Sequence, residues 1–145
     1  MTSWVCLDSG IVLKFVLPEA DSQQAKALWQ SIITTRQQPV APFLFPFEIT
    51  STLRKRTYRG DISEKFSLMA LRQILSLPIN FTTFDNMHEQ AWQLAGRFNR
   101  PAAYDAHYLA LAEHLGCEFW TADKRLYNAV SNDLSWVRWL GDFSS

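Results

Sequence analysis

The amino-acid sequence predicts an α/β fold, in which a central, mostly parallel sheet of about five strands is covered by helices on both faces. Short apolar runs alternate with longer amphipathic segments, as expected when crossover helices connect parallel strands. The length of 145 residues is typical of one domain. Hydrophobic residues make up 48% of the chain, which is enough for a sizeable core and argues against disorder.

Five short and largely apolar segments are predicted to be strands, because their lengths suit strands better than helices. In the second of them, Pro42 excludes the interior of a helix and favours an extended chain. In chain order, the five predicted strands are residues 3–7, 40–45, 79–84, 117–123 and 135–140.

The longer segments between these strands are predicted to be helices. The clearest helix lies before Gly116, because Tyr104 and Tyr108 share an apolar face and glycine is a common residue just after a helix end. Asp21 and Gln24 have the spacing of a capping box at the start of the first predicted helix. In chain order, the predicted helices are residues 19–35, 46–60, 62–77, 86–98, 102–116 and 124–130.

The charge and cysteine content limit the possible classes of protein. The formal net charge is zero, so a nucleic-acid partner would require a local basic patch. Cys6 and Cys117 lie far apart and form no CxxC motif, which predicts buried thiols in a reducing compartment. The N-terminal residues lack the features of a signal peptide and no apolar run approaches bilayer length. We therefore expect a cytoplasmic protein without a membrane segment.

Four acidic residues are predicted to meet at one edge of the sheet. Asp8 and Asp123 directly follow predicted strands, and Glu48 is expected in the first turn of the helix after the second strand. Asp105 lies near the start of its helix and can reach the same edge. Ligands of open parallel sheets bind outside the carboxyl ends of the strands. The same edge is therefore the predicted site of function.

Carboxylates crowded into one crevice repel one another unless a cation neutralises them. Their hard oxygen atoms suit Mg²⁺ or Mn²⁺, which retain open positions for water and phosphate oxygens. A metal ion in this position can activate water and stabilise a phosphodiester during in-line attack. The alternative is that each acid caps a helix or faces solvent, and the positions alone support both interpretations equally.

The sequence resembles the PIN-domain proteins, specifically the VapC-like bacterial toxin ribonucleases. The resemblance covers essentially the whole chain and rests on the order and spacing of four motifs, which are VCLDSGIVLKFVLPE, PFEITSTLRK, AAYDAHYLALAEHLG and FWTADKRL. It implies a three-layer α/β/α sandwich formed by a single PIN domain over residues 1–145.

The resemblance also implies an activity, a Mg²⁺- or Mn²⁺-dependent endoribonuclease that hydrolyses RNA phosphodiester bonds as the toxin of a toxin–antitoxin pair. It maps the acidic quartet of the family onto Asp8, Glu48, Asp105 and Asp123, and a supporting hydroxyl onto Thr121. Asp8, Asp105 and Asp123 are the expected metal ligands, either directly or through water. Glu48 is expected to bind a second metal ion or to orient the attacking water.

The implied partners are an RNA substrate, a cognate VapB-like antitoxin and a second copy of the chain in a homodimer. In the family, the C-terminal segment of the antitoxin occupies the active-site groove. One position departs from the family pattern, in which Asp and a small residue are often followed by Ser, Thr or Asn. Here that third position is Gly10 and the hydroxyl is on Ser9, and the sequence leaves open whether Ser9 supports the site instead.

Basic residues near the four acids are candidate RNA contacts. Lys124 and Arg125 adjoin Asp123, whereas Arg54 belongs to a basic cluster that is equally well explained as a solvated helix face. Lys14 is expected either to pair with a carboxylate of the site or to extend along the surface. Its neighbour Glu19 is expected to be solvated.

Two other classes of function are compatible with these patterns. A receiver-like phosphoryl-transfer domain also places Asp at strand ends, but the sequence offers no convincing lysine after a late strand. A catalytically silent PIN-like module would only bind a partner, and it would show no Mg²⁺ or Mn²⁺ binding that depends on Asp8 and Asp105.

Overall fold

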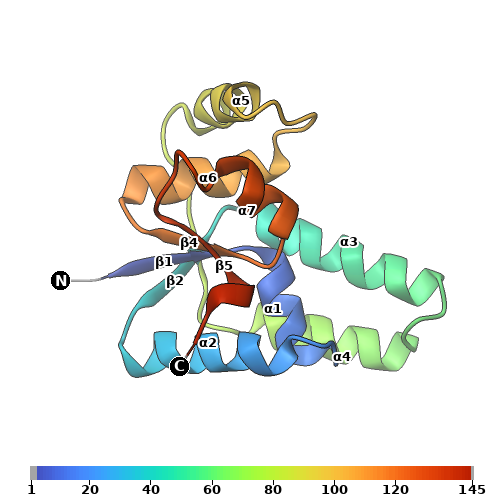
Figure 1. Ribbon diagram of the computed structural model, residues 1–145. Coiled ribbons are helices and arrows are strands. Elements are labelled where there is room, and N and C mark those ends of the chain that lie inside the picture. The colour runs from blue at the N-terminus through green and yellow to red at the C-terminus, as the bar shows by residue number, and fades with distance from the viewer. Residues whose placement is uncertain (1–2, 145) are drawn as a thin grey trace.

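The computed structural model describes residues 3–144 and has five parallel strands in the order β3-β2-β1-β4-β5. Residues 1, 2 and 145 of the predicted domain lie outside the described residues. Helices lie on both sides of the sheet (Figure 1), so the predicted α/β/α sandwich is confirmed. The strands are β1 (Trp4–Leu7), β2 (Gln38–Ala41), β3 (Asn80–Phe81), β4 (Glu118–Thr121) and β5 (Val137–Trp139).

Seven α-helices cover this sheet within the described part of the chain. Helices α2 and α4 lie below it in Figure 1, whereas α6 and α7 lie above it and α5 packs on the outer side of α6. The helices are α1 (Ser9–Val16), α2 (Ser22–Thr34), α3 (Leu44–Tyr58), α4 (Glu64–Leu75), α5 (Met87–Arg97), α6 (Tyr104–Leu115) and α7 (Lys124–Val130). A short 3₁₀-helix follows β5 at Leu140–Asp142.

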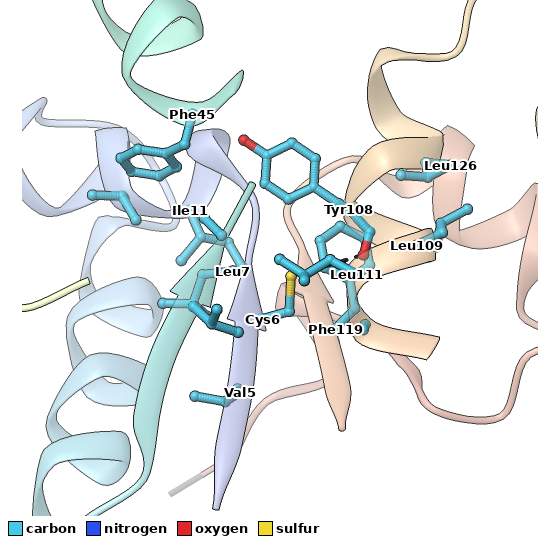
Figure 2. Packing of buried hydrophobic residues seen from close by; sticks show 14 of the residues in the cluster. Val5, Cys6, Leu7, Ile11, Phe45, Tyr108, Leu109, Leu111, Phe119 and Leu126 are labelled. Carbon is cyan, nitrogen blue, oxygen red and sulfur yellow. Dashed lines mark hydrogen bonds between the residues drawn. The ribbon is translucent and has the colours of Figure 1, made fainter. Parts of the chain in front are cut away.

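Strand β1 lies at the centre of the sheet and is buried on both faces. Val5, Cys6 and Leu7 are each at most 1% exposed, as expected for a parallel strand covered by helices on both sides. Figure 2 shows Cys6 on the side of α6, which carries Tyr108. The predicted burial of Cys6 is confirmed, and Cys117 is half-buried.

Helix α1 begins directly after β1 and was not predicted from the sequence. Asp8 is its N-cap, and a carboxylate oxygen of Asp8 accepts a hydrogen bond of 2.8 Å from the backbone N–H of Ile11. The predicted extended segment 40–45 was also too long, because α3 already begins at Leu44. The change from strand to helix therefore occurs earlier than the position of Pro46 indicates.

The predicted capping box of Asp21 and Gln24 was wrong. The Asp21 side chain makes no capping hydrogen bond. The Gln24 amide instead donates to the carbonyl oxygens of Gly141 and Phe143 at 3.2 and 2.8 Å, which ties α2 to the segment after β5. Among the described residues, no helix combines the length and the apolar character that crossing a bilayer requires.

Candidate active site

The four predicted acids come from elements that end or begin at the carboxyl edge of the sheet. Asp8 follows β1, Asp123 follows β4, and Asp105 lies in the first turn of α6. Glu48 lies two residues deeper in α3 than expected and outside its first turn, because that helix begins at Leu44 and not at Pro46. Its carboxylate is therefore not beside the helix N-terminus, whereas Asp105 does lie in a first turn, where the helix dipole favours negative charge.

Hydrogen bonds fix the Asp8 carboxylate from two sides. One oxygen accepts the backbone N–H of Ile11, and the other accepts the backbone N–H of Ala122 at 3.1 Å. The second oxygen also accepts a short hydrogen bond from the hydroxyl of Thr121. Because these donors come from α1, from the last residue of β4 and from the residue after it, the Asp8 side chain connects α1 to the end of β4.

Thr121 connects two of the acids through a single hydroxyl group. Its side chain is fully buried, donates to Asp8 and accepts the backbone N–H of Asp123 at 3.0 Å. Asp123 is the N-cap of α7, with one oxygen accepting the N–H groups of Arg125 and Leu126 at 2.9 and 3.2 Å. Thr121 therefore stands where a supporting hydroxyl is expected, between two candidate ligands.

The four carboxylates interact electrostatically, and Asp105 links them. Burial raises the pKa of Asp8 to about 6, and the charge of Asp105 adds to the rise. Burial also raises the pKa of Asp105, with a further contribution from the charge of Asp123. The pKa of Glu48 is raised by burial and then by the charges of Asp105 and Asp8. These acids therefore repel one another across one shared region.

Tyr108 belongs to the site, although its sequence pattern predicted only an apolar face of its helix. Its ring is 1% exposed, and its hydroxyl donates a hydrogen bond of 2.6 Å to Glu48. This bond favours the charged form of the carboxylate and opposes the rise in its pKa. A buried tyrosine hydroxyl normally requires a polar partner, and this requirement was the one available signal in the sequence.

Ser9 and Gly10 lie beside different acids. Ser9 lines a cavity together with Glu48, and its hydroxyl favours the charged form of that carboxylate. A Cβ atom at Gly10 would lie 3.4 Å from an oxygen of Asp8. A side chain at position 10 would therefore face Asp8, so Ser9 supports Glu48 and does not replace a hydroxyl at that position.

The candidate RNA contacts have different surroundings. The Lys124 ammonium lies 4.1 Å from the centre of the Trp139 ring, whereas Arg125 is exposed at the start of α7. Arg54 is exposed and approaches Glu64 at 3.7 Å. The only cation paired with a site carboxylate in the described residues is Arg100, whose guanidinium lies 3.7 Å from Asp105.

Lys14 does not reach the four acids and pairs at the far end of α1. Its ammonium lies 2.7 Å from Glu19 and 2.8 Å from Asp21. Glu19 also binds the guanidinium of Arg56 on α3 at 2.7 Å. The prediction that Glu19 is simply solvated was wrong, because two cations surround its carboxylate.

The residues of the site fit a hard divalent cation in their chemistry. Four carboxylates in one region supply oxygen ligands, and their mutual repulsion is what a bound cation would relieve. Within residues 3–144, no three His, Cys, Asp or Glu side chains are grouped closely enough to hold a metal ion without rearrangement. Ligation by these acids would therefore involve side-chain movement or intervening water.

Comparison with known proteins agrees with the observed fold. The family model described as PIN domain matches residues 5–131. The chain is 34% identical over 122 residues to VapC ribonuclease Mb0985 of Mycobacterium bovis and to Ribonuclease VapC9 of Mycobacterium tuberculosis. Each match covers 84% of this chain and 87% of the relative.

A solved structure of low sequence identity has a similar fold. VapC20 of Mycobacterium tuberculosis, described as a Sarcin-Ricin loop cleaving toxin, superimposes with a TM-score of 0.66 at 17% identity. The match covers 87% of this chain and 95% of VapC20. PIN-domain VapC nucleases are in general metal-dependent. By its sequence matches to this family model and to these relatives, the chain belongs to the PIN domain family and, within it, to the VapC ribonucleases.

Proposed function

We propose that this chain is a Mg²⁺- or Mn²⁺-dependent endoribonuclease and the toxin of a toxin–antitoxin pair, formed by a single PIN domain over residues 1–145. The observation that carries the proposal is the group of four carboxylates at the carboxyl edge of the sheet. Burial raises the pKa of both Asp8 and Glu48 and the charge of Asp105 adds to both rises, so these acids share one crowded region that a cation can neutralise.

Each residue has a role that follows from its contacts. Asp8, Asp105 and Asp123 hold the cation, either directly or through water. Thr121 and the N–H of Ala122 fix the orientation of Asp8. When bound, the cation activates water and stabilises the negative charge on the phosphodiester.

Glu48 orients the attacking water or holds a second cation. The phenol hydroxyl of Tyr108 donates a hydrogen bond to the Glu48 carboxylate and so favours its charged form. Lys124, Arg125 and Arg54 contact the phosphates of the RNA. A VapB-like antitoxin and a second copy of the chain are the proposed protein partners.

The test compares purified wild type with Asp8→Asn in an RNA cleavage assay. We expect wild type to cleave RNA with Mg²⁺ or Mn²⁺ and to stop when EDTA is added. Asp8→Asn should lose this activity while retaining the circular dichroism spectrum of wild type. Asp133→Asn is the matched control, because Asp133 is exposed and lies outside the site.

Two outcomes would contradict the proposal. Full cleavage by Asp8→Asn would contradict the assignment of the four acids as the metal-binding catalytic group. Absence of cleavage by wild type, combined with absence of Mg²⁺ or Mn²⁺ binding in calorimetry, would favour the alternative of a catalytically silent module that binds a partner.

The toxin role can be tested in cells. We expect growth arrest on induction of wild type but not of Asp8→Asn.

A further inference from the structure

Two exposed aromatic side chains directly precede two of the candidate site acids. Phe47 precedes Glu48 and is 72% exposed, and Tyr104 precedes Asp105 and is 64% exposed. Phe43, one turn before Phe47, is 54% exposed. Single exposed apolar residues are ordinary, but a group of large rings on one surface commonly marks an interaction site.

The two rings lie between neighbouring cavities at the edge of the sheet. One cavity of about 390 Å³ is lined by Phe47, Tyr104 and the candidate site residues Ser9 and Glu48. A second cavity of about 420 Å³ is lined by the same two rings and by Phe43, and it extends to α5. Both volumes fall in the range of small-molecule binding sites.

Phe47 also lines a third cavity, which is bordered by cations. This cavity, of about 570 Å³, runs along α3 past Ser51 to Arg54 and Lys55. These residues lie four, seven and eight positions after Phe47, the spacing of one helical face. No ion pair holds Lys55 among the described residues, whereas Arg54 approaches Glu64 at 3.7 Å.

We propose that Phe47 and Tyr104 form a stacking platform for a nucleobase of single-stranded RNA beside the acids. The inference rests on the proposed ribonuclease function and adds to it the residues that hold the substrate. Bases stack on aromatic side chains while a basic groove follows the phosphates, and this is the usual arrangement for single-stranded nucleic acid. Phe47 and Lys55 line both the cavity that contains Glu48 and the cavity bordered by Arg54.

The position of each ring follows from the helix that carries the acid. On α3, Phe45 is fully buried and anchors the helix in the core, so the core does not require Phe47. The helical turn that places Glu48 at the site leaves Phe47 on the outer surface. A base stacked on Phe47 would therefore share a cavity with Glu48 and Lys55.

The platform can be tested by RNA binding in the cleavage-deficient Asp8→Asn background. The probes are 12-nucleotide oligouridine and oligoadenosine, and a 12-nucleotide ribose-phosphate strand without bases. Phe47→Leu keeps an apolar side chain but removes the ring, and we expect it to weaken binding of the two base-bearing probes by about 5- to 150-fold. Phe47→Trp should restore the affinity.

Two controls separate stacking from other effects. The base-free strand should bind all these variants equally, because it offers only phosphates and sugars. Trp92→Leu is the matched control on α5, since Trp92 is 74% exposed and lines none of the three cavities. It should leave the affinity for every probe unchanged.

The outcomes separate this inference from the proposed function. Unchanged affinity of Phe47→Leu for the base-bearing probes would overturn the platform, even if the Asp8 variant confirms the nuclease. The same result with a change in molecular mass by light scattering would assign the rings to contact between two copies of the chain. If wild type cleaves no RNA but Phe47→Leu loses affinity only for base-bearing probes, the platform stands and the nuclease assignment fails.

Discussion

Helix α1 has a cluster of charged side chains at each end, and the two clusters differ in how their charges are balanced. At its N-terminal end, Asp8 belongs to a group of four carboxylates, of which Asp105 is paired with Arg100 at 3.7 Å. Beyond its C-terminal end, Glu19 lies between Lys14 and Arg56, with both cations 2.7 Å away.

The opposite pKa changes at the two ends reflect this difference. Burial raises the pKa of Asp8 to about 6. Burial also acts to raise the pKa of Glu19, but Lys14 and Arg56 outweigh it, so the net change is downward. The paired cluster therefore ties α1, α2 and α3 together, whereas the acidic cluster stores repulsion that a cation can relieve. A group of crowded acids indicates a functional site more clearly when the acids lack paired cationic side chains than when they have them.

The largest expected effect is on RNA cleavage, and it concerns the acidic cluster at the N-terminal end of α1. Tyr108→Phe removes the hydroxyl that donates to Glu48, and we expect RNA cleavage to fall about 10- to 100-fold, as for other groups that orient ligands. The acidic limb of the pH–rate profile should move to higher pH, because the hydrogen bond favours the charged carboxylate. Tyr127→Phe is the control, and an unshifted profile would leave Tyr108 with a packing role only.

The second expected effect is on the stability of the metal-free protein. The folded protein holds a proton on Asp8 up to about pH 6, while the unfolded chain releases it near 3.8, so stability falls as pH rises between these values. Asp8→Asn avoids this cost of about 3 kcal/mol, but loses the acceptor used by Ala122 and Thr121, worth about 1 kcal/mol for each hydrogen bond. We expect a net gain of about 1 kcal/mol at pH 7.

Thermal unfolding with EDTA between pH 4 and 8 would measure this gain. Added Mg²⁺ should stabilise wild type and leave Asp8→Asn unchanged, because only wild type retains the full set of acids. Equal stability of the two proteins at pH 7 without metal would mean that Asp8 carries no electrostatic cost.

The third effect concerns the paired cluster of Lys14, Glu19 and Arg56. Glu19→Gln leaves Lys14 and Arg56 without their shared carboxylate, and we expect a loss of about 1 kcal/mol, since the cluster is partly exposed. The pKa of Glu19 is lowered on folding, so its contribution is present above 4.5 and is lost as pH falls through the lower folded value. Denaturant unfolding at pH 7 and pH 3 tests this difference, and cleavage by the folded variant should be unchanged.

The smallest effect is expected at Gly10. A Cβ atom there would lie 3.4 Å from Asp8 and 3.7 Å from Ala122, which is ordinary contact. Gly10→Ser should therefore change unfolding free energy by less than about 0.5 kcal/mol and retain cleavage. A large loss of activity on this substitution would mean that the acidic region requires the absence of a side chain.

The fold and the position of the acids follow from rules that act along the chain. Alternation of strands and helices predicts the parallel sheet, and strand ends predict the edge where Asp8 and Asp123 meet. Helix α1 was missed because Ile11, Val12 and Leu13 are all buried, so the segment shows no helical period. Such a run has the same pattern in a buried helix and in a buried strand.

The remaining contacts depend on residues far apart in sequence, which no local pattern reveals. Tyr108 meets Glu48 across 60 positions, so its hydroxyl could not be assigned to the site from its own helix. Arg56 meets Glu19 across 37 positions, and the sequence indicated only a solvated acid at one place and a basic helix face at the other. Side-chain pairing of this kind is decided by packing.

The central position of β1 has a consequence for the protein during its synthesis. The first strand pairs with β4, and Asp8 is held by Thr121 and Ala122, which lie 113 and 114 positions later. A chain still being synthesised carries Asp8 and Glu48 long before the segment that fixes them exists. The candidate centre is therefore completed only after the chain has been synthesised past Asp123, and fragments that stop before residue 121 lack it.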